Sequence, residues 1–277
     1  QIFWCGLPHQ KTSDNSDVKL NKFEVLKSER GALAKNNIYK QFINYYSNMK
    51  TVGIIGGLGP ETTSEFYLDL VFSCQKKDKT HRPSIIIASV PLPYKIEEEA
   101  IAKGIGFERI PPFLIEEAKR LEKSGADFIV MPCNSLHVFI KEIRNAVKIP
   151  VLSIIEETVK FLKKNKFKKV GIVSTSATIK NKLYENAFEE NHIGYETPDD
   201  FQQAKMGKII LNLVTGMQNN KDREELIKII SDFEKKNVDC VVLACTDLQL
   251  LIPKLPSLKI FDTMKIFADA TVEKILE

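Results

Sequence analysis

The sequence has few of the residues that build metal sites and disulfide frameworks. It contains five cysteines, an odd number with no CxxC pair, and only four histidines, none of them in an HExxH pattern. A zinc site and a disulfide framework are therefore not expected, and this cysteine usage fits a reducing compartment, the cytoplasm. The sequence also shows no evident site for pyridoxal phosphate, so we expect no cofactor and no metal.

Long apolar runs and a one-sided charge are also missing. No apolar stretch approaches the roughly 20 residues that a membrane-spanning helix needs, and residues 1–48 lack the apolar core of a signal peptide. Forty Lys and Arg residues are nearly balanced by 36 Asp and Glu residues, which leaves a net charge of +4. This balance argues against a nucleic-acid partner. We expect a small-molecule substrate and no membrane partner.

What the sequence does contain is enough apolar residues for a sizeable core, 43% of 277, which suits one large domain or two of ordinary size. From Met49 onward, short apolar runs alternate with amphipathic stretches. This alternation predicts parallel sheets in βαβ units, with ligands at the carboxyl ends of the strands. The predicted strands are 51–56, 84–89, 127–131, 150–154, 169–174, 239–244 and 258–261. The predicted helices are 61–77, 107–124, 135–147, 155–165, 178–191, 205–217, 222–236 and 265–276.

Two sequence patterns of the first half recur in the second half. "KTVGIIGGLGPETT" at 50–63 is echoed by "KKVGIVSTSATIK" at 168–180, and "GADFIVMPCNSLHVFIKEIRNAVKIPVLSI" at 125–154 by "NVDCVVLACTDLQLLIPKLPSLKIFDT" at 237–263. In each copy a strand opens onto a turn of small residues, and a later strand that starts near an Asp delivers a cysteine. The distance between the copies is far longer than in repeat arrays. The pattern therefore predicts an internal duplication of an α/β domain.

We expect an α/β protein of two pseudo-symmetric parallel-sheet domains flanked by helices, with the active site in the cleft between them. The first domain is predicted to comprise 49–149 plus 263–277, and the second 150–262. Residues 1–48 are rich in Lys, Asn and Ser and are predicted to be an extension outside the folded unit. A short helix at 37–47 is the alternative for that part.

Cys133 and Cys245 stand at equivalent points of the two copies, each directly after a strand that reads as buried. The residues that follow are helix-capping types, namely Asn134 and Ser135 in the first copy and Thr246 and Asp247 in the second. A thiol at a helix N-terminus meets free backbone N–H groups and a partial positive charge, which lower its pKa. The same amides bind a carboxylate. The pattern predicts two reactive thiols beside a small acid.

Two thiols on opposite walls of one cleft suit stereoinversion at Cα. One thiolate removes the Cα proton, and the opposite thiol delivers another proton to the other face. The reverse reaction exchanges the two roles, so a pseudo-twofold protein matches a symmetric reaction. General acid–base catalysis also needs pKa values near the working pH, which thiols can reach.

These residues resemble the cofactor-independent aspartate/glutamate racemase superfamily and, within it, the aspartate racemase branch. The matching segments are "GIIGGLGPETT" (53–63), "MPCNSLH" (131–137) and "LACTDL" (243–248), and the resemblance covers nearly all of the chain from Met49 to Glu277. It implies an amino-acid racemase, usually a homodimer, in which Cys133 and Cys245 are the two acid/base residues. It also implies that four residues line the substrate site: Leu58, Asn134, Ser135 and Thr246.

The departures from the family pattern concern the substrate more than the chemistry. Ser135 stands where the family usually has Thr, and Asp247 where it often has Glu. Aspartate-specific members hold the side-chain carboxylate with an arginine, and the best-matching residue here is Lys95. A lysine is a point charge and cannot bind a carboxylate through two parallel hydrogen bonds. A second basic residue of the family is replaced by Val214 or Thr215. The substrate therefore stays open between aspartate, glutamate and a broader set of amino acids.

Two other functions stay open. A thiol pair also serves a decarboxylase or a cis–trans isomerase of a small diacid, in which one sulfur acts as a nucleophile. A catalytically silent binding protein with the same fold is the other alternative, although the retention of both cysteines counts against it.

Several further residues have competing interpretations. The glycine-rich opening at 56–59 lacks the GxGxxG spacing of a dinucleotide site, and with Pro60 after it we expect a tight strand-to-helix turn that lines the pocket. His137 is either an ordinary surface or half-buried histidine or a support for Cys133. Three residues of the second opening turn either contact the substrate or cap the next helix: Thr175, Ser176 and Thr178. Two cysteines are expected to be core residues: Cys74 and Cys240.

Overall fold

The computed structural model describes residues 49–103, 105–251 and 258–277. These residues belong to one compact unit, Asn48–Glu277. The predicted N-terminal extension, residues 1–48, lies outside the described residues. Among the described helices, none has both the length and the apolar character that crossing a membrane requires.

The described residues form two parallel sheets, one in each half of the unit. The first sheet has the strand order β2-β1-β3, which are Ile85–Ser89, Val52–Gly56 and Phe128–Val130. The second has the order β5-β4-β6-β7, which are Gly194–Glu196, Lys169–Ser174, Cys240–Ala244 and Ile260–Asp262. All neighbouring strands pair in parallel. Strands β1 and β3 occupy the same places in the first sheet as β4 and β6 in the second.

Helices connect the strands and flank both sheets. In the first half they are α3 (Pro60–Lys77), α4 (Tyr94–Lys103), α5 (Pro111–Lys123) and α6 (Ile140–Ala146), with 3₁₀ helices at Phe107–Arg109 and Ser135–Phe139. In the second half they are α7 (Ile154–Lys164), α8 (Ser176–Lys180), α9 (Leu183–Glu190), α10 (Asp200–Val214) and α11 (Asn220–Asp232), with 3₁₀ helices at Phe233–Lys236 and Leu248–Leu251. The last helix is α12 (Thr263–Ile275). The prediction of two parallel-sheet domains flanked by helices is confirmed.

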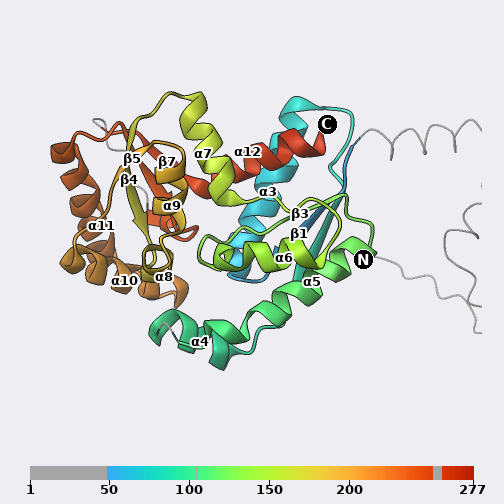
Figure 1. Ribbon diagram of the computed structural model, residues 1–277, viewed down its shortest axis with the longest axis horizontal. Coiled ribbons are helices and arrows are strands. Elements are labelled where there is room, and N and C mark those ends of the chain that lie inside the picture. Colours follow the sequence, from blue (N-terminus) through green and yellow to red (C-terminus); the bar gives the residue numbers. More distant parts are fainter. Residues whose placement is uncertain (1–48, 104, 252–257) are drawn as a thin grey trace, which may run out of the picture. The chain divides into compact units, whose positions relative to one another are not determined.

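The alternation of side chains along the strands builds three apolar clusters. Val52 and Ile54 face a central cluster that also contains Ile172 and Val242 of the second sheet, whereas Ile55 faces an outer cluster under α5 and α6. The central cluster includes side chains of α3, α7, α9 and α12. A third cluster joins the far face of the second sheet to α10 and α11. Figure 1 shows α12 crossing the middle of the unit between the two sheets.

Helix α12 follows β7 in sequence but packs against α3 of the first half and against α7. Most of its buried apolar residues belong to the central cluster that both sheets share, namely Met264, Phe267, Ala268, Val272 and Ile275. The assignment of 263–277 to the first domain, with 49–149, and of 150–262 to the second stays a prediction.

The predicted strand at 150–154 is wrong. Val151 forms a single parallel bridge with Ile129, and helix α7 begins shortly afterwards. The side chain of Ser153 accepts a hydrogen bond from the backbone N–H of Glu156 and so caps the helix. Because this cap begins α7 at Ile154, the extended segment at Val151 ends before it can form a longer strand. The hydrophobic run alone does not distinguish a strand from the first turn of a buried helix.

The predicted helix at 178–191 is divided, and one strand has no predicted counterpart. The break between α8 and α9 lies at Lys182, whose φ of 51° is left-handed. Just before it, the side chain of Asn181 donates to the carbonyl of Ala177 and closes α8. Strand β5 has only three residues, which is too short to show an alternating pattern.

Candidate active site

The opening turn of the first copy is fixed by glycines and one threonine. Gly57 has a φ of 81°, and a Cβ there would meet the Oγ of Ser89 at 2.5 Å, so only glycine fits. The hydroxyl of Thr63 accepts from the N–H of Gly57 at 2.9 Å and donates to the carbonyl of Gly59 at 3.0 Å. Pro60 is the first residue of α3. The predicted tight strand-to-helix turn is confirmed.

The loop that carries Cys133 is tied to the second half of the chain. Cys133 is half-buried, and Asn134, at 2% exposure, is buried. The Asn134 amide donates to the Oγ1 of Thr263 at 3.1 Å, and its Oδ1 accepts from the hydroxyl of Tyr184 at 2.6 Å. The side chain of Asn134 is therefore committed to α9 and α12, which anchors the residue next to the thiol.

Ser135 meets the opening turn of the second copy. Its Oγ lies 2.9 Å from the Oγ1 of Thr175 and 3.3 Å from the Oγ1 of Thr178. The Oγ1 of Thr175 also accepts from the N–H of Thr178 at 3.1 Å and caps α8. The prediction that this turn caps the next helix is confirmed for Thr175, and contact with the substrate stays a prediction.

The loop that carries Cys245 meets the opening turn of the first copy in return. Cys245 is 4% exposed, and its Sγ lies 3.7 Å from the Oδ2 of Asp247. The other carboxylate oxygen, Oδ1, accepts from the hydroxyl of Thr62 in the first turn of α3, at 3.1 Å. Each cysteine loop thus contacts the opening turn of the other copy.

Burial raises the pKa of the Cys245 thiol well above its ordinary value. The negative charges of Asp247 and Cys133 raise the pKa further, and hydrogen bonds from the backbone at Asp247 and Leu248 lower it by less. The predicted lowering of the thiol pKa by a helix N-terminus is therefore wrong for Cys245. The reason is that the following segment is a short 3₁₀ helix, Leu248–Leu251, while the thiol itself is desolvated.

The charge of Cys133 is among the causes that raise the pKa of Cys245. Each cysteine loop is also hydrogen-bonded to the opening turn of the other copy, so the two predicted cysteines belong to one site. Their catalytic role is a separate question, which the geometry alone leaves as a prediction.

Carboxyl groups gather on the Cys245 side of the site. The pKa of Asp247 is raised by burial first and by the charge of Glu61, against a lowering by the Thr62 hydroxyl. The pKa of Glu65 is raised by burial and by the charges of Asp69 and Asp247. These carboxyls do not form a metal site, because no group of three or more potential ligands gathers among the described residues.

The other predicted site residues lie at different depths. Thr246 is buried at 5% exposure, and Leu58 is half-buried against the outer cluster of the first half. Lys95 lies in the first turn of α4 with an exposed side chain. Val214, at the end of α10, is 43% exposed. Within the described residues, the structure ties each cysteine loop by hydrogen bonds to the opening turn of the other copy and leaves Lys95 at the surface.

Cys74 and Cys240 are core residues, as predicted. Both are fully buried in the central cluster. Burial raises the pKa of Cys74 to about 11 and that of Cys240 to about 12. Neither thiol is available as a base near neutral pH.

Sequence reasoning missed three residues that shape the site. Tyr184 and Thr263 hold Asn134 from α9 and α12, and Thr62 holds Asp247 from α3. Thr62 carried a signal, because it lies in the opening motif that precedes α3. Tyr184 and Thr263 carried none, since they come near Asn134 only through the packing of α9 and α12.

Comparisons with known proteins agree with this geometry. The family described as Asp/Glu/Hydantoin racemase matches residues 55–271. The broad specificity amino-acid racemase RacX of Bacillus subtilis (strain 168) is 29% identical over 230 residues, which are 81% of this chain and 98% of that protein.

Solved structures with the same fold include an aspartate racemase homologue and an aspartate racemase. An aspartate racemase homologue from Pyrococcus horikoshii OT3 has a TM-score of 0.68 and 29% identity, and the match covers 83% of this chain and 100% of that one. The aspartate racemase of Picrophilus torridus has a TM-score of 0.64 and 26% identity, over 82% of this chain and 96% of that one. The residues that the family matches, 55–271, include both cysteine loops.

Proposed function

The chain belongs to the Asp/Glu/hydantoin racemase family and is an amino-acid racemase, and we propose that it inverts Cα with Cys133 and Cys245 as a cofactor-free acid/base pair. One observation supports this mechanism: each cysteine loop is hydrogen-bonded to the opening turn of the other copy, Ser135 to Thr175 and Asp247 to Thr62, so the two thiols flank one site. Inversion needs a base on one face of Cα and an acid on the opposite face, and a duplicated fold supplies both.

The surroundings of the two thiols suggest their resting protonation. Cys245 is buried beside a carboxylate and stays protonated at neutral pH, so it is the acid of the resting enzyme. Cys133 is half-buried and is the base. In the forward direction the Cα–H bond breaks, the proton moves to Cys133, and Cys245 gives its own proton to the opposite face of the carbanion.

The opposite direction starts from the state in which the forward direction ends, with a thiolate at Cys245 and a protonated Cys133. The Cys245 thiolate removes the Cα proton of the other enantiomer, and Cys133 gives its own proton to the opposite face. Between turnovers Cys245 returns to its protonated resting form by proton exchange with water. Asp247, whose Oδ2 lies 3.7 Å from the sulfur, favours this protonated form through its negative charge.

We infer that backbone and hydroxyl groups of the two loops bind the α-carboxylate. Ser135 and Thr246 follow the thiols directly, and the Leu58 turn lies beside α3 at the carboxyl end of β1. Asn134 contributes through its backbone, since its side chain is committed to Tyr184 and Thr263.

The substrate that we propose is a broad set of α-amino acids rather than aspartate alone. Lys95, the best match to the family arginine, is exposed on α4, and Val214 replaces the second basic residue. Carboxyl groups near Cys245, among them Asp247 and Glu65, add negative charge that disfavours an acidic side chain nearby. The similarity to a broad specificity racemase over 98% of that protein's length supports the same inference.

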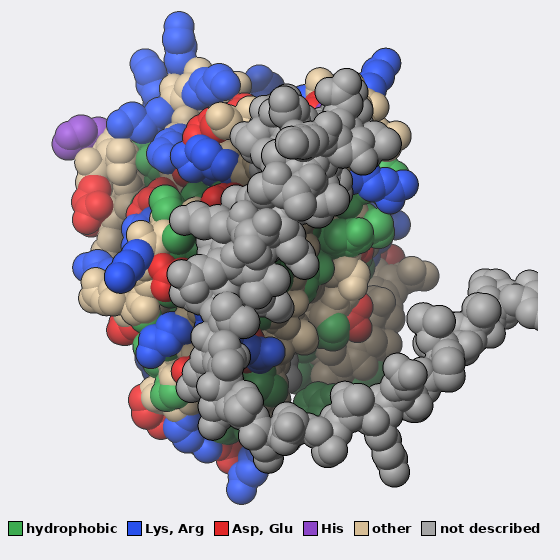
Figure 2. Space-filling model, turned by 90° about the vertical axis from the view of Figure 1, so that its right-hand side faces the viewer, with side chains coloured by type: hydrophobic (Ala, Val, Ile, Leu, Met, Phe, Trp, Pro, Cys, Tyr) green, Lys and Arg blue, Asp and Glu red, His purple; other side chains and the backbone are tan. Residues whose placement is uncertain are grey.

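We also infer a cytoplasmic homodimer that acts on a small molecule. The four cysteines in the described part of the chain are free thiols, which the mechanism requires and a reducing compartment preserves. On the face that Figure 2 shows, Lys and Arg side chains are interspersed with Asp and Glu, which supports a small molecule rather than a nucleic acid as the partner.

The dimer face that we propose combines α3 with the edge strand β2. Large apolar side chains are exposed there: Tyr67, Leu68, Phe72 and Ile87. Exposed apolar patches of this kind mark contact surfaces. Sedimentation equilibrium tests the proposal: Leu68→Glu should shift a dimer to monomer, and a monomeric wild type contradicts it.

The racemase function is tested with separate D- and L-amino acids in deuterium oxide. Loss of optical activity with one deuterium at Cα of the product is the expected result for several amino acids. A product formed without deuterium argues against proton abstraction. The absence of inversion across the panel would overturn the function itself.

A further inference from the structure

The side chain of His137 is almost fully enclosed and uses both ring nitrogens. It is 2% exposed. Its Nδ1 lies 2.6 Å from the carbonyl oxygen of Cys133, and its Nε2 lies 3.1 Å from the backbone nitrogen of Ile154, the first residue of α7. A carbonyl only accepts and a backbone N–H only donates. The proton is therefore on Nδ1, and Nε2 is the acceptor.

The imidazole is neutral under working conditions. Burial lowers the pKa of His137 to about 4, and the charge of Arg144 lowers it as well, against the effects of the Cys133 carbonyl and of Glu156. With both nitrogens bonded to the backbone, the ring does not exchange protons with the substrate near neutral pH. His137 therefore acts on the site through the groups that it holds.

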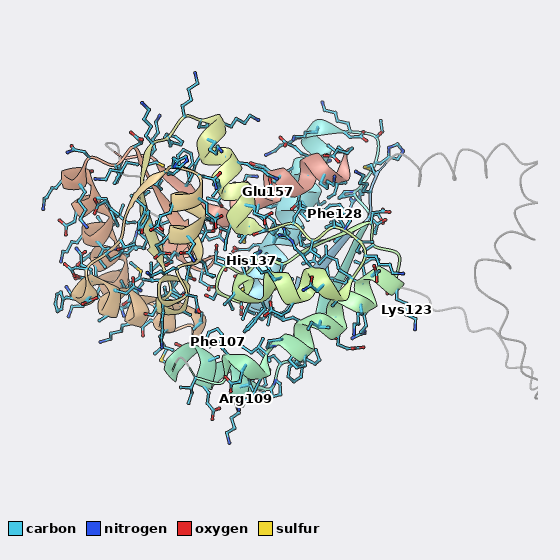
Figure 3. All side chains as sticks on the ribbon, viewed as in Figure 1. Phe107, Arg109, Lys123, Phe128, His137 and Glu157 are labelled. Atoms are coloured by element: carbon cyan, nitrogen blue, oxygen red, sulfur yellow. The ribbon has the colours of Figure 1, made fainter. Side chains whose placement is uncertain are left out.

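Those groups determine where the thiol of Cys133 points. The backbone nitrogen of Cys133 donates to the carbonyl of Met131 at 2.8 Å, and its carbonyl accepts from His137. Both polar backbone groups of the residue are thus held, and the ring also packs edge-on against Phe267 of α12 with centroids 6.4 Å apart. Figure 3 places His137 near the centre of the unit, beside α6 and α7.

We propose that His137 is the positioning residue of Cys133: its imidazole ties the Cys133 carbonyl to the start of α7 and thereby aims the thiol at Cα. The inference rests on the proposed racemisation for its kinetic consequences. The two cysteines are then held in different ways. The neutral ring of His137 holds the backbone of Cys133, whereas Asp247 contacts the sulfur of Cys245.

Two variants separate the two hydrogen bonds of the ring. The amide of Asn reaches the place of Nδ1, so His137→Asn retains a donor for the Cys133 carbonyl. The amide of Gln reaches the place of Nε2, so His137→Gln retains the acceptor for Ile154 and loses the bond to Cys133. We expect His137→Gln to lower kcat by roughly 10- to 100-fold with little change in KM, because small displacements of a reacting group are costly. His137→Asn should restore most of that loss.

Isotope effects distinguish positioning from a general defect. If the Cys133 step becomes slow in His137→Gln, substrate deuterated at Cα shows a large isotope effect on kcat for the enantiomer whose proton Cys133 removes. For the other enantiomer the effect approaches one, because Cys245 removes that deuterium in a step that no longer limits the rate. Equal isotope effects for the two enantiomers, with activity loss that follows the folded fraction in thermal unfolding, would overturn the proposal.

Site-resolved alkylation gives a readout that does not depend on racemisation. Iodoacetamide labelling is followed by peptide mass spectrometry in the full chain, with the Cys245 peptide as internal control. We expect the Cys133 labelling rate to change several-fold in His137→Gln and to return toward wild type in His137→Asn. An unchanged Cys133 rate in both variants refutes the role of His137. A wild type that labels as expected but inverts no amino acid refutes the racemase function instead.

Discussion

The two cysteine loops start from equivalent strands, β3 and β6, and differ in what surrounds the thiol. The Cys133 loop is held by neutral groups: the ring of His137, the hydroxyl of Tyr184 and the hydroxyls around Ser135. The Cys245 loop has a carboxylate, Asp247, in contact with the sulfur. One thiol is half-buried and the other is buried.

This difference shows what a duplication preserves and what it lets vary. The placement is preserved, because each cysteine loop contacts the opening turn of the other copy, Ser135 with Thr175 and Asp247 with Thr62. The electrostatics have diverged, because a buried thiol next to a carboxylate has a raised pKa. In the mechanism that we propose, a reaction that is symmetric in its chemistry is thus served by two thiols with different resting states.

The largest effect is expected from removing either thiol. Cys133→Ser and Cys245→Ser should each lower racemisation by roughly 10²- to 10⁴-fold, because a hydroxyl is a much weaker acid and cannot replace a general acid–base group. Chiral chromatography of the product measures the loss. The matched control is Cys74→Ala, since Cys74 is a buried core thiol far from neutral titration. Full activity in either serine variant contradicts the two-thiol mechanism.

The next effect concerns the opposite pH responses of the two halves. His137 has a folded pKa of about 4, below the roughly 6.5 of an unfolded chain. The folded state binds this proton less tightly, so the free energy of unfolding falls as pH drops from about 6.5 to about 4. Asp262, whose pKa burial raises to about 6, behaves in the opposite way. Its contribution to the free energy of unfolding rises as pH drops from about 6 to about 4, by at most about 3 kcal/mol.

Two variants separate the pH dependence of stability that comes from Asp262 from that which comes from His137. Asp262→Asn keeps the side-chain acceptor for the N–H of Met264 and removes the titrating group. The free energy of unfolding of Asp262→Asn should therefore fall more steeply than that of wild type as the pH drops. The free energy of unfolding of His137→Asn should fall less steeply. Urea unfolding between pH 7 and pH 4.5 measures both, and curves parallel to wild type contradict the assignment.

The carboxylate at the second thiol has a smaller effect, roughly tenfold. Asp247→Asn removes the charge that raises the pKa of Cys245. Alkylation of Cys245 should then begin at lower pH, while racemisation slows because less of this thiol is protonated and able to act as the acid. Peptide mapping of alkylation against pH shows the shift. An unchanged alkylation profile means that Asp247 does not act on this thiol.

The sequence predicts the parts of the site that depend on local pattern. The duplicated motifs led to both cysteines, and the glycine spacing with Pro60 led to the opening turn. The pKa of the Cys245 thiol was predicted in the wrong direction, because the burial of this thiol depends on how β6 packs under α10 and α11 and cannot be read from the motif. The partners Tyr184 and Thr263 were missed for the same reason, since they reach Asn134 only after α9 and α12 pack.

The smallest effects come from the hydrogen bonds that cross between the halves. Tyr184→Phe removes the donor to the Oδ1 of Asn134, and Thr62→Val removes the donor to the Oδ1 of Asp247. Each should lower the free energy of unfolding by about 1 kcal/mol, the usual net value of one hydrogen bond. Urea unfolding at one pH measures both.

The same two variants also distinguish the two cysteine loops by the pH dependence of racemisation. The Thr62 hydroxyl lowers the pKa of Asp247, so Thr62→Val should raise that pKa and move the pH dependence of racemisation toward higher pH. Tyr184 acts on Asn134, which does not titrate, and Tyr184→Phe should change the rate without moving the profile. Equal shifts in both variants would mean that the two loops respond as one structural unit. A shift confined to Thr62→Val places the titrating carboxylate at Cys245 alone.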